Sequence, residues 1–144
     1  STTLSGAAWF EVTSSFNGTS VGATIANQGY VVANAAFLLY PAVAVAPDGT
    51  AAMTMTITNS TTFPSAIYTT MASGQKSFGA LKVAAFGAQA DIGFSAVGGP
   101  GRWGDYSAAV PDPSGSGIWM ATEYIPGAGD GIANWGTRVF EAAS

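Results

Sequence analysis

Residues 47–58 read Pro-Asp-Gly-Thr-Ala-Ala-Met-Thr-Met-Thr-Ile-Thr, and this stretch decides the fold class. From residue 53 onward, apolar side chains alternate with threonines, which is the two-residue period of a β-strand with two different faces. The first four residues are typical of a hairpin turn, because proline fixes its own φ and glycine tolerates a positive one. The stretch therefore predicts a strand over 51–58 that pairs with the apolar residues before the turn.

The same pattern of short apolar runs separated by Gly, Pro, Asn and Asp continues along the whole chain. A second turn of the same kind occupies residues 111–115, and helical periodicity is almost absent. We expect an all-β fold with strands near Ala7–Thr13, Ser20–Ala26, Tyr40–Ala46, Ala51–Thr58, Ser65–Met71, Ala80–Gly87, Tyr106–Val110, Ile118–Tyr124 and Thr137–Ala142.

Composition excludes several classes of function. The 144 residues suffice for a single domain, and 48% of them are hydrophobic while only 8% are charged. Four Lys and Arg residues provide no clustered basic surface, which excludes a nucleic-acid binder. The chain has no His and no Cys, which excludes Ser–His–Asp and Cys–His catalysis, zinc fingers, iron–sulfur sites and disulfide scaffolds.

The low charge also bears on the compartment, because about a quarter of the residues of a typical soluble domain are charged. We expect a secreted or cell-surface protein whose leader has been removed. Two Asn-x-Ser/Thr sequons, at Asn17 and Asn59, are candidate glycosylation sites. No apolar run approaches the roughly 18 residues that a membrane-spanning helix needs, so we expect a chain that does not span a membrane.

Several segments of the chain echo one another. Residues 8–12, 66–70 and 138–142 are alike, with Phe10, Tyr68 and Phe140 in register. Residues 40–45 and 106–110 form a second echo, and each is followed by another predicted strand. The interval between echoes, about 60–70 residues, is near the upper end for a propeller blade with long loops.

Four segments, 40–45, 63–68, 102–107 and 134–138, resemble parts of secreted sialidase-like β-propeller proteins, many of them of unknown function. The run Arg102-Trp103-Gly104-Asp105-Tyr106-Ser107 is the most specific. The family's turn signature, Ser-x-Asp-x-Gly-x-x-Trp, is met only in degenerate form at Asp48-Gly49 and at residues 112–115.

The resemblance implies antiparallel four-stranded blades: a partial blade over 7–34, a full blade over 38–90 and a C-terminal blade over 101–142. A closed propeller needs at least about four blades. The resemblance therefore implies that the chain is completed by other copies of itself or by a partner fragment of its precursor. The alternative is a self-contained β-sandwich.

Side chains suited to chemistry or binding concentrate after residue 101. Asp105 and Glu123 are the candidate carboxylate pair for glycoside hydrolysis. The candidate ligand-binding residues are Arg102, Trp103, Tyr106 and Trp135. Sialidases use three arginines with a Tyr–Glu nucleophile and an Asp acid, and this chain has two arginines, so the resemblance does not supply a complete catalytic site. A structural role for Arg102 and Asp105, bonded to turns or strands, is the stronger interpretation.

We expect no cofactor. Asp48, Asp112 and Asp130 lie in Gly-rich turns that could offer oxygen ligands to Ca²⁺, but they lack the acidic spacing of an EF-hand. The function we expect is that of an extracellular, non-catalytic structural or interaction module that assembles with copies of itself or with another fragment. The alternatives are a glycoside hydrolase fragment and a carbohydrate-binding module that uses Trp103, Trp119 and Trp135 to bind glycans.

Overall fold

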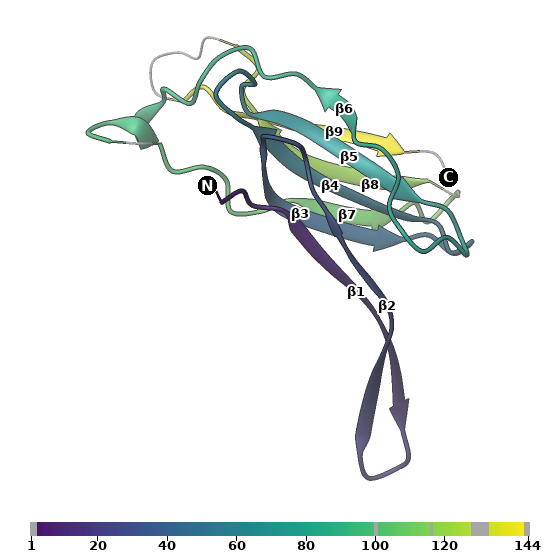
Figure 1. Cartoon of the computed structure of the whole chain (residues 1–144). Helices are drawn as coiled ribbons and strands as arrows, with labels where there is room; N and C mark the ends of the chain where they lie inside the picture. Colours follow the sequence, from purple (N-terminus) through teal and green to yellow (C-terminus); the bar gives the residue numbers. More distant parts are fainter. Residues whose placement is uncertain (1–2, 100, 116, 128–132, 143–144) are drawn as a thin grey trace.

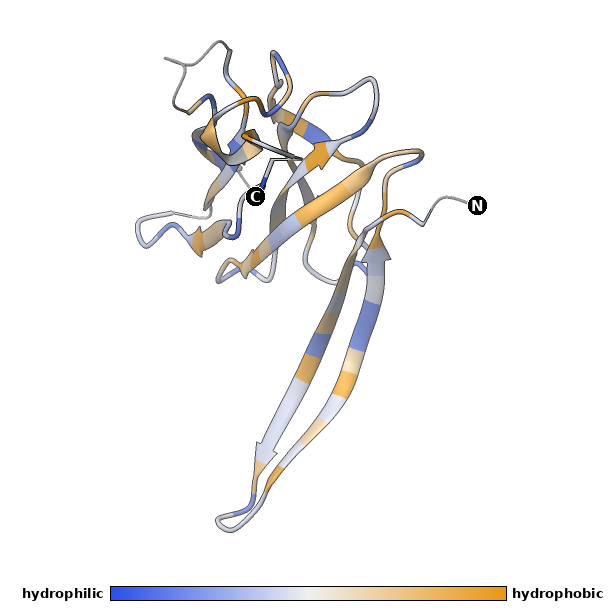
Figure 2. Ribbon diagram, turned by 90° about the vertical axis from the view of Figure 1, so that its left-hand side faces the viewer, coloured by the Kyte–Doolittle hydropathy of each residue, from blue (hydrophilic) through white to orange (hydrophobic). Residues whose placement is uncertain are grey.

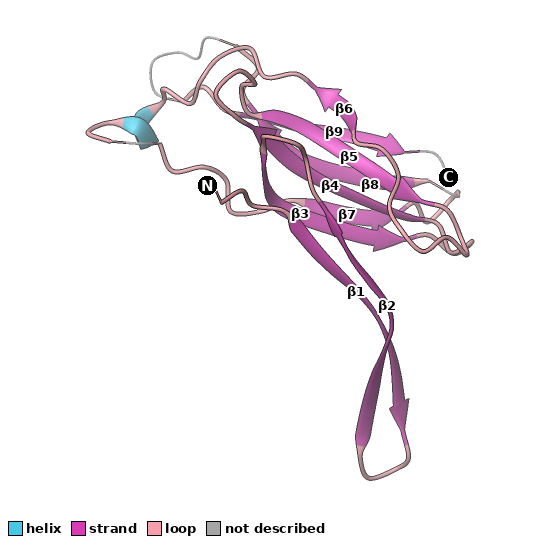
Figure 3. Cartoon of the chain, in the orientation of Figure 1, coloured by secondary structure: helices cyan, strands magenta, loops and turns pink. Residues whose placement is uncertain are grey.

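A computed structural model describes residues 3–99, 101–115, 117–127 and 133–142 of the chain (Figure 1). Within these residues the fold is built from β-strands and one short 3₁₀ helix, η1 (Figure 3). The strands are β1 (Ala7–Phe16), β2 (Val21–Val31), β3 (Phe37–Val45), β4 (Ala51–Thr58), β5 (Ser65–Met71), β6 (Lys82–Ala85), β7 (Ala108–Pro111), β8 (Ile118–Tyr124) and β9 (Gly136–Ala142), and η1 is Phe94–Ala96. The all-β class is confirmed.

The strands form three antiparallel sheets in which consecutive strands are neighbours. β1 pairs with β2, β3 to β6 form a four-stranded meander, and β7 to β9 form a three-stranded meander. The described strands do not close into a barrel. The sequence pattern places all nine strands. Compared with the prediction, β1 extends further toward the connecting turn, to Phe16, and β2 extends further away from it, to Val31.

The turn between β3 and β4 forms as its residues predict. The backbone N–H of Gly49 donates to the carbonyl of Ala46 at 2.9 Å, and Gly49 adopts a φ of 89°. The carboxylate of Asp48 accepts hydrogen bonds from the backbone N–H and the hydroxyl of Thr50. These contacts fix the turn and therefore the register of the β3–β4 hairpin.

Strand β4 is buried on both of its faces. Met53 and Met55 point into one hydrophobic cluster, and Ala52 points into another on the opposite side of the sheet. The threonines are as buried as the methionines, but their hydroxyls are satisfied. Thr54 donates to the carbonyl of Ile67 at 2.9 Å, and Thr56 donates to the carbonyl of Glu123 at 2.8 Å. A buried hydroxyl that keeps its hydrogen bond avoids the cost of desolvation.

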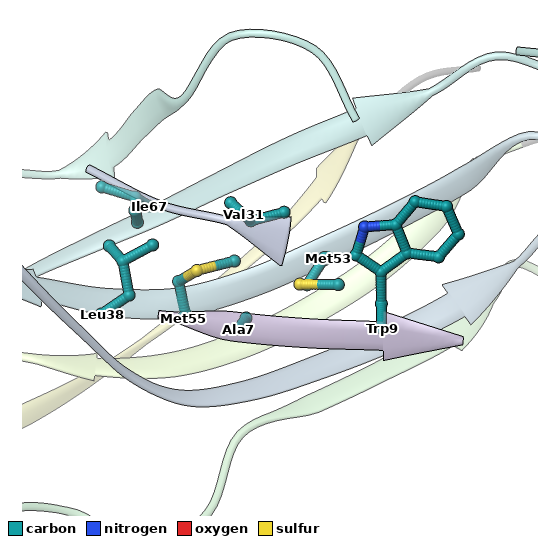
Figure 4. Close-up of a cluster of buried hydrophobic side chains, with 7 residues drawn as sticks. All are labelled: Ala7, Trp9, Val31, Leu38, Met53, Met55 and Ile67. Atoms are coloured by element: carbon teal, nitrogen blue, oxygen red, sulfur yellow. The ribbon is translucent and has the colours of Figure 1, made fainter. Parts of the chain in front are cut away.

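Three layers result from this double burial. On one side of the β3–β6 sheet, the base of the β1–β2 hairpin inserts Trp9 and Val31 against Met53 (Figure 4). On the other side, Ile118 and Met120 of β8 pack against the same sheet. Trp9 also meets the ring of Phe78 edge-on, with the ring centroids 5.5 Å apart. The order of layers is therefore the β1–β2 base, the β3–β6 sheet and the β7–β9 sheet.

The echoed segments stack on one another in space. β3 contacts β7, and β4 contacts β8. The rings of Tyr68 and Phe140 pack at 5.3 Å, but they face each other from opposite layers. Ile67, the neighbour of Tyr68 in β5, points to the opposite side of its sheet, into the cluster that contains Trp9 and Met53. Its side chain therefore points in the same direction as that of Phe140. A one-residue offset reverses the face of a strand residue, so the echo is aligned one position away from the predicted register.

Candidate functional site

A cleft of about 270 Å³ collects most of the predicted binding residues. Its lining consists of Asp91, Phe94, Arg102, Trp103, Gly104, Glu123 and Trp135. Glu123 comes from β8 and Trp135 directly precedes β9, whereas the other residues come from the long connection between β6 and β7. Tyr106, also predicted to bind ligand, is 85% exposed and does not line the cleft.

Glu123 is held in place through its backbone. Thr56 donates a hydrogen bond to the backbone carbonyl of Glu123. The preceding residue, Thr122, is fixed as well, because its hydroxyl lies 2.8 Å from that of Ser107. Burial of its carboxyl group raises the pKa of Glu123 above its ordinary value, and the negative charges of Asp105 and Asp91 add to this shift. Glu123 therefore retains its proton to a higher pH than an exposed glutamate does.

Asp105 is engaged by a neighbour in sequence. Its Oδ2 lies 2.6 Å from Nη2 of Arg102, in an ion pair three residues apart that is largely exposed to solvent. Asp105 is not part of the cleft lining, so the predicted pair of Asp105 and Glu123 does not share one cavity.

The two tryptophans of the cleft differ in their surroundings. Nε1 of Trp103 is buried without a hydrogen-bond partner in the described part of the chain, whereas Trp135 is half exposed. Gly104 directly follows Trp103 and also lines the cleft. Its φ is 55°, and an added Cβ would lie 3.0 Å from the ring of Tyr40. The cleft offers an apolar ring surface beside one guanidinium and two carboxyl groups.

Sequence reasoning missed two residues of this region. Asp91 lines the cleft, although nothing in its local sequence distinguishes it from a loop aspartate. Asn134 is buried and donates from Nδ2 to the carbonyl of Ala90 at 2.8 Å, which ties the loop that carries Asp91 to the segment before β9. No signal in the sequence distinguishes Asn134 either, because its burial and its contact with Ala90 arise only in the folded chain.

The aspartates considered as Ca²⁺ ligands serve their own turns. The Asp48 carboxylate bonds Thr50, and the Asp112 carboxylate accepts hydrogen bonds from the backbone N–H and hydroxyl of Ser114. Asp130 lies outside the described residues. In the part of the chain that is described, no three acidic side chains gather as metal ligands would.

The second prominent feature is an arm formed by residues 10–26 of the β1–β2 hairpin (Figure 1). Every residue of this arm is exposed, whereas Ala7, Trp9 and Val31 at its base are buried. Asn17 lies at the tip of the arm, where its side-chain oxygen accepts hydrogen bonds from the backbone of Thr19 and Ser20. The other sequon residue, Asn59, donates from Nδ2 to the carbonyl of Ala35.

The arm has one apolar face and one polar face, and a β-bulge keeps them separate. The register shifts between Glu11 and Val12, which leaves Ala26 as an extra residue on β2. Residues paired across an antiparallel ribbon share a face. The pairs on one face are Val12 with Ile25, Ser14 with Ala23 and Phe16 with Val21, and those on the other are Glu11 with Asn27, Thr13 with Thr24 and Ser15 with Gly22.

Without the bulge, the apolar residues of β2 would move to the polar face, because a shift by one residue reverses every side chain of a strand. Figure 2 shows apolar and polar positions along the arm. We define the arm face as six exposed large apolar residues on one side of the β1–β2 hairpin, 54–78% accessible to solvent. Five of them lie in the arm and the sixth, Tyr30, lies at its base: Phe10, Val12, Phe16, Val21, Ile25 and Tyr30. The bulge therefore gathers these side chains on one face, which they share with Ser14, Ala23 and Gln28.

Comparison of the chain with protein-family models, with curated proteins and with solved structures yielded no match. Within the described residues, no helix is long and apolar enough to cross a membrane.

We expect Glu123→Gln to raise the free energy of unfolding at neutral pH and to leave it almost unchanged in acid. The pKa of Glu123 is raised in the folded state, so the wild type loses stability as the pH rises from the ordinary value of 4.5 through that raised pKa. Glutamine carries no charge into the cleft and removes this loss. Urea unfolding of both proteins from about pH 3 to about pH 8 measures the difference.

Asp112→Asn is the matched control and has the opposite sign. Hydrogen bonds from the backbone and hydroxyl of Ser114 hold the pKa of Asp112 below its ordinary value of 3.8. The stability that Asp112 contributes is therefore present at neutral pH and is lost as the pH falls through the lowered pKa. If the free energies of unfolding of the wild type and of Glu123→Gln changed with pH in parallel, the cleft would not raise the pKa of Glu123.

Proposed function

We propose that this chain is an extracellular, non-catalytic structural module that assembles with copies of itself through the arm. The observation that carries the proposal is the arm face, six apolar side chains that lie exposed on one side of the β1–β2 hairpin. A β-bulge keeps the apolar side chains of both strands on this one face, which is a feature that a ribbon surrounded only by water does not need.

The energetics of the ribbon support the same proposal. A two-stranded hairpin is marginally stable in water on its own, and strands of ten and eleven residues span roughly 33 Å. Burying a valine or isoleucine side chain contributes about 1.5–3 kcal/mol. Association that covers the arm face therefore stabilises the arm and removes exposed apolar surface at the same time.

Two further features favour a structural module over an enzyme. Asp105, one of the two candidate catalytic carboxylates, is paired with Arg102 and does not itself line the cleft. β3 contacts β7 and β4 contacts β8 in the neighbouring sheet, which is consistent with propeller-type blades that further copies would complete. The low content of charged residues supports an extracellular location.

The test replaces one cross-strand pair of the arm face by Val12→Lys with Ile25→Glu. We expect this variant to associate at least about 100-fold more weakly than the wild type, because two charges would have to be buried in the interface. The new residues have opposite charges and stand directly across from one another, so the ribbon itself is preserved. Sedimentation equilibrium over a concentration series measures the native mass against the 14.4 kDa of one chain.

The control variant, Thr13→Lys with Thr24→Glu, makes the same substitutions on the polar face, one rung further along the arm. It should associate like the wild type. A wild type that stays at 14.4 kDa at every concentration would overturn the proposal. A second, different fragment found by intact mass spectrometry in the protein from its source would identify a partner fragment instead of a second copy.

A further inference from the structure

The cleft beside Glu123 gathers aromatic rings from three separate segments of the chain. Phe94 belongs to η1, Trp103 to the connection between β6 and β7, and Trp135 to the segment before β9. Phe94 is 60% exposed and Trp135 is half exposed, so ring surface is open to a molecule that enters the cleft. The faces of aromatic rings carry partial negative charge and attract a cation placed over them.

Trp103 offers the cleft carbon and not its N–H group. The residue is half-buried, and its Nε1 is inaccessible to solvent and has no hydrogen-bond partner within the residues that the structure describes. The part of the indole that reaches the cleft is therefore apolar ring surface. Like the other two rings, it is suited to apolar and cation–π contact.

The charged groups of the cleft carry more negative than positive charge. Asp91 and Glu123 line it, and burial, followed by the negative charges of Asp105 and Asp91, raises the pKa of Glu123. These three carboxyl groups therefore act on one another across a short distance. Arg102 also lines the cleft, but its guanidinium lies 2.6 Å from the carboxylate of Asp105, which matches its charge. A second positive group in the cleft would offset the remaining negative charge.

The lining does not suit a metal ion. Among the described residues, no three acidic side chains gather as metal ligands would. An ion such as Ca²⁺ needs six to eight oxygen ligands, whereas much of this cleft is walled by aromatic rings. Such rings bind large, weakly hydrated cations, of which the quaternary ammonium group is the usual example.

We infer that this cleft binds a small organic cation with a quaternary ammonium group, of the size of choline, against its aromatic rings and beside the carboxyl groups of Asp91 and Glu123. The volume of about 270 Å³ lies below the roughly 300–1,000 Å³ of sites that take drug-sized molecules, which suits one small headgroup. The inference goes beyond the proposed assembly and does not depend on it, because the cleft and the arm face share no residue.

A neutral sugar is the alternative ligand, and the cleft suits it less. It would not offset the negative charge that Asp91 and Asp105 impose on Glu123. Arg102, a donor that could bind sugar hydroxyls, is already engaged by Asp105. The charge of the ligand is therefore the property that the experiment has to vary.

The experiment titrates the full chain with choline chloride and follows the tryptophan indole N–H signals by two-dimensional NMR, with sodium chloride at equal concentration as the reference. Of the four tryptophans, Trp103 and Trp135 line the cleft. We expect their signals to shift and to saturate, and those of Trp9 and Trp119 to stay in place. Dimethylbutanol, the uncharged carbon analogue of choline, should bind at least about 10-fold more weakly, because it lacks the attraction of the cation to the rings and carboxylates.

Two variants with matched controls locate the binding site. Trp135→Leu and Glu123→Gln should each weaken choline binding at least about 5-fold. Trp119→Leu and Glu141→Gln remove an exposed ring and an exposed carboxyl group outside the cleft, and both should bind like the wild type. Because Glu123→Gln is expected to be more stable than the wild type at neutral pH, its weaker binding would not reflect a loss of fold.

Three results would overturn the inference. The first is equal affinity for choline and dimethylbutanol, and the second is a choline titration in which the Trp103 and Trp135 signals do not shift or do not saturate. The third is a neutral monosaccharide that shifts both signals where choline does not.

Two further arms separate this inference from its neighbours. Co-sedimentation with phosphatidylcholine vesicles would place the ammonium group on a lipid headgroup, and choline binding without co-sedimentation would place it on a free molecule; both results support the cation site. The arm variant, Val12→Lys with Ile25→Glu, should bind choline like the wild type. A failure of assembly and a failure of cation binding are therefore separate results.

Discussion

Replacing Trp9 by alanine is expected to lower the free energy of unfolding by about 3–5 kcal/mol, the usual cost of removing a buried tryptophan. Trp9 is the largest side chain that the β1–β2 hairpin inserts against the middle sheet. Its ring contacts Phe78 edge-on and packs over Gly29 of the paired strand, where an added Cβ would lie 2.9 Å from the indole. The alanine variant therefore leaves a cavity that no neighbour is placed to fill.

The measurement is the midpoint and slope of urea unfolding, followed by far-ultraviolet circular dichroism. Phe86→Ala provides the control, because this equally aromatic residue is 76% exposed and lies outside the arm face. We expect it to change stability by less than about 0.5 kcal/mol. Equal effects of the two substitutions would mean that the hairpin base is not packed on the body.

Met120→Ala is expected to lower the free energy of unfolding by about 2–5 kcal/mol. Met120 is buried between the two larger sheets, in the cluster that contains Ala52 and Ile118. It lies on the opposite side of β4 from Trp9, so the two losses should add to within about 0.5 kcal/mol in the double variant. Both substitutions should shift one and the same unfolding transition, because β4 belongs to both clusters.

Calorimetry of the Met120→Ala protein tests this coupling. Two separate transitions would show that the β7–β9 sheet unfolds independently of the rest of the molecule. Val83→Ala, at an exposed position of β6, serves as the reference for a strand valine outside the core.

The alternation of residues 51–58 and the turn before it were sufficient to place β4 and the β3–β4 hairpin. The sequence could not indicate that both faces of β4 are buried. A threonine face normally suggests exposure to solvent on one side, and here Thr54 and Thr56 are buried because partners distant in sequence accept their hydrogen bonds. The bulge opposite Glu11 was equally invisible, since it appears only when β2 is paired with β1.

The candidate cleft was predicted in part. Arg102, Trp103, Glu123 and Trp135 were singled out by residue type and meet in one cavity. Tyr106 does not join them, because the chain carries its ring into solvent just before β7. Asp91 was missed, since a loop residue comes to a site through contacts such as that of Asn134 with Ala90, which local sequence does not encode.

The sequence by itself determined the all-β class, the positions of the nine strands and the hairpin turns, because alternation and turn chemistry act between residues close in the chain. The tertiary structure alone decided the order of the three layers and the composition of the cleft. It also decided that Val12 and Phe16 share one side of the arm with Ile25. These features depend on register and on packing between residues far apart in the chain, and a single extra residue such as Ala26 reverses the face on which the side chains of a strand lie.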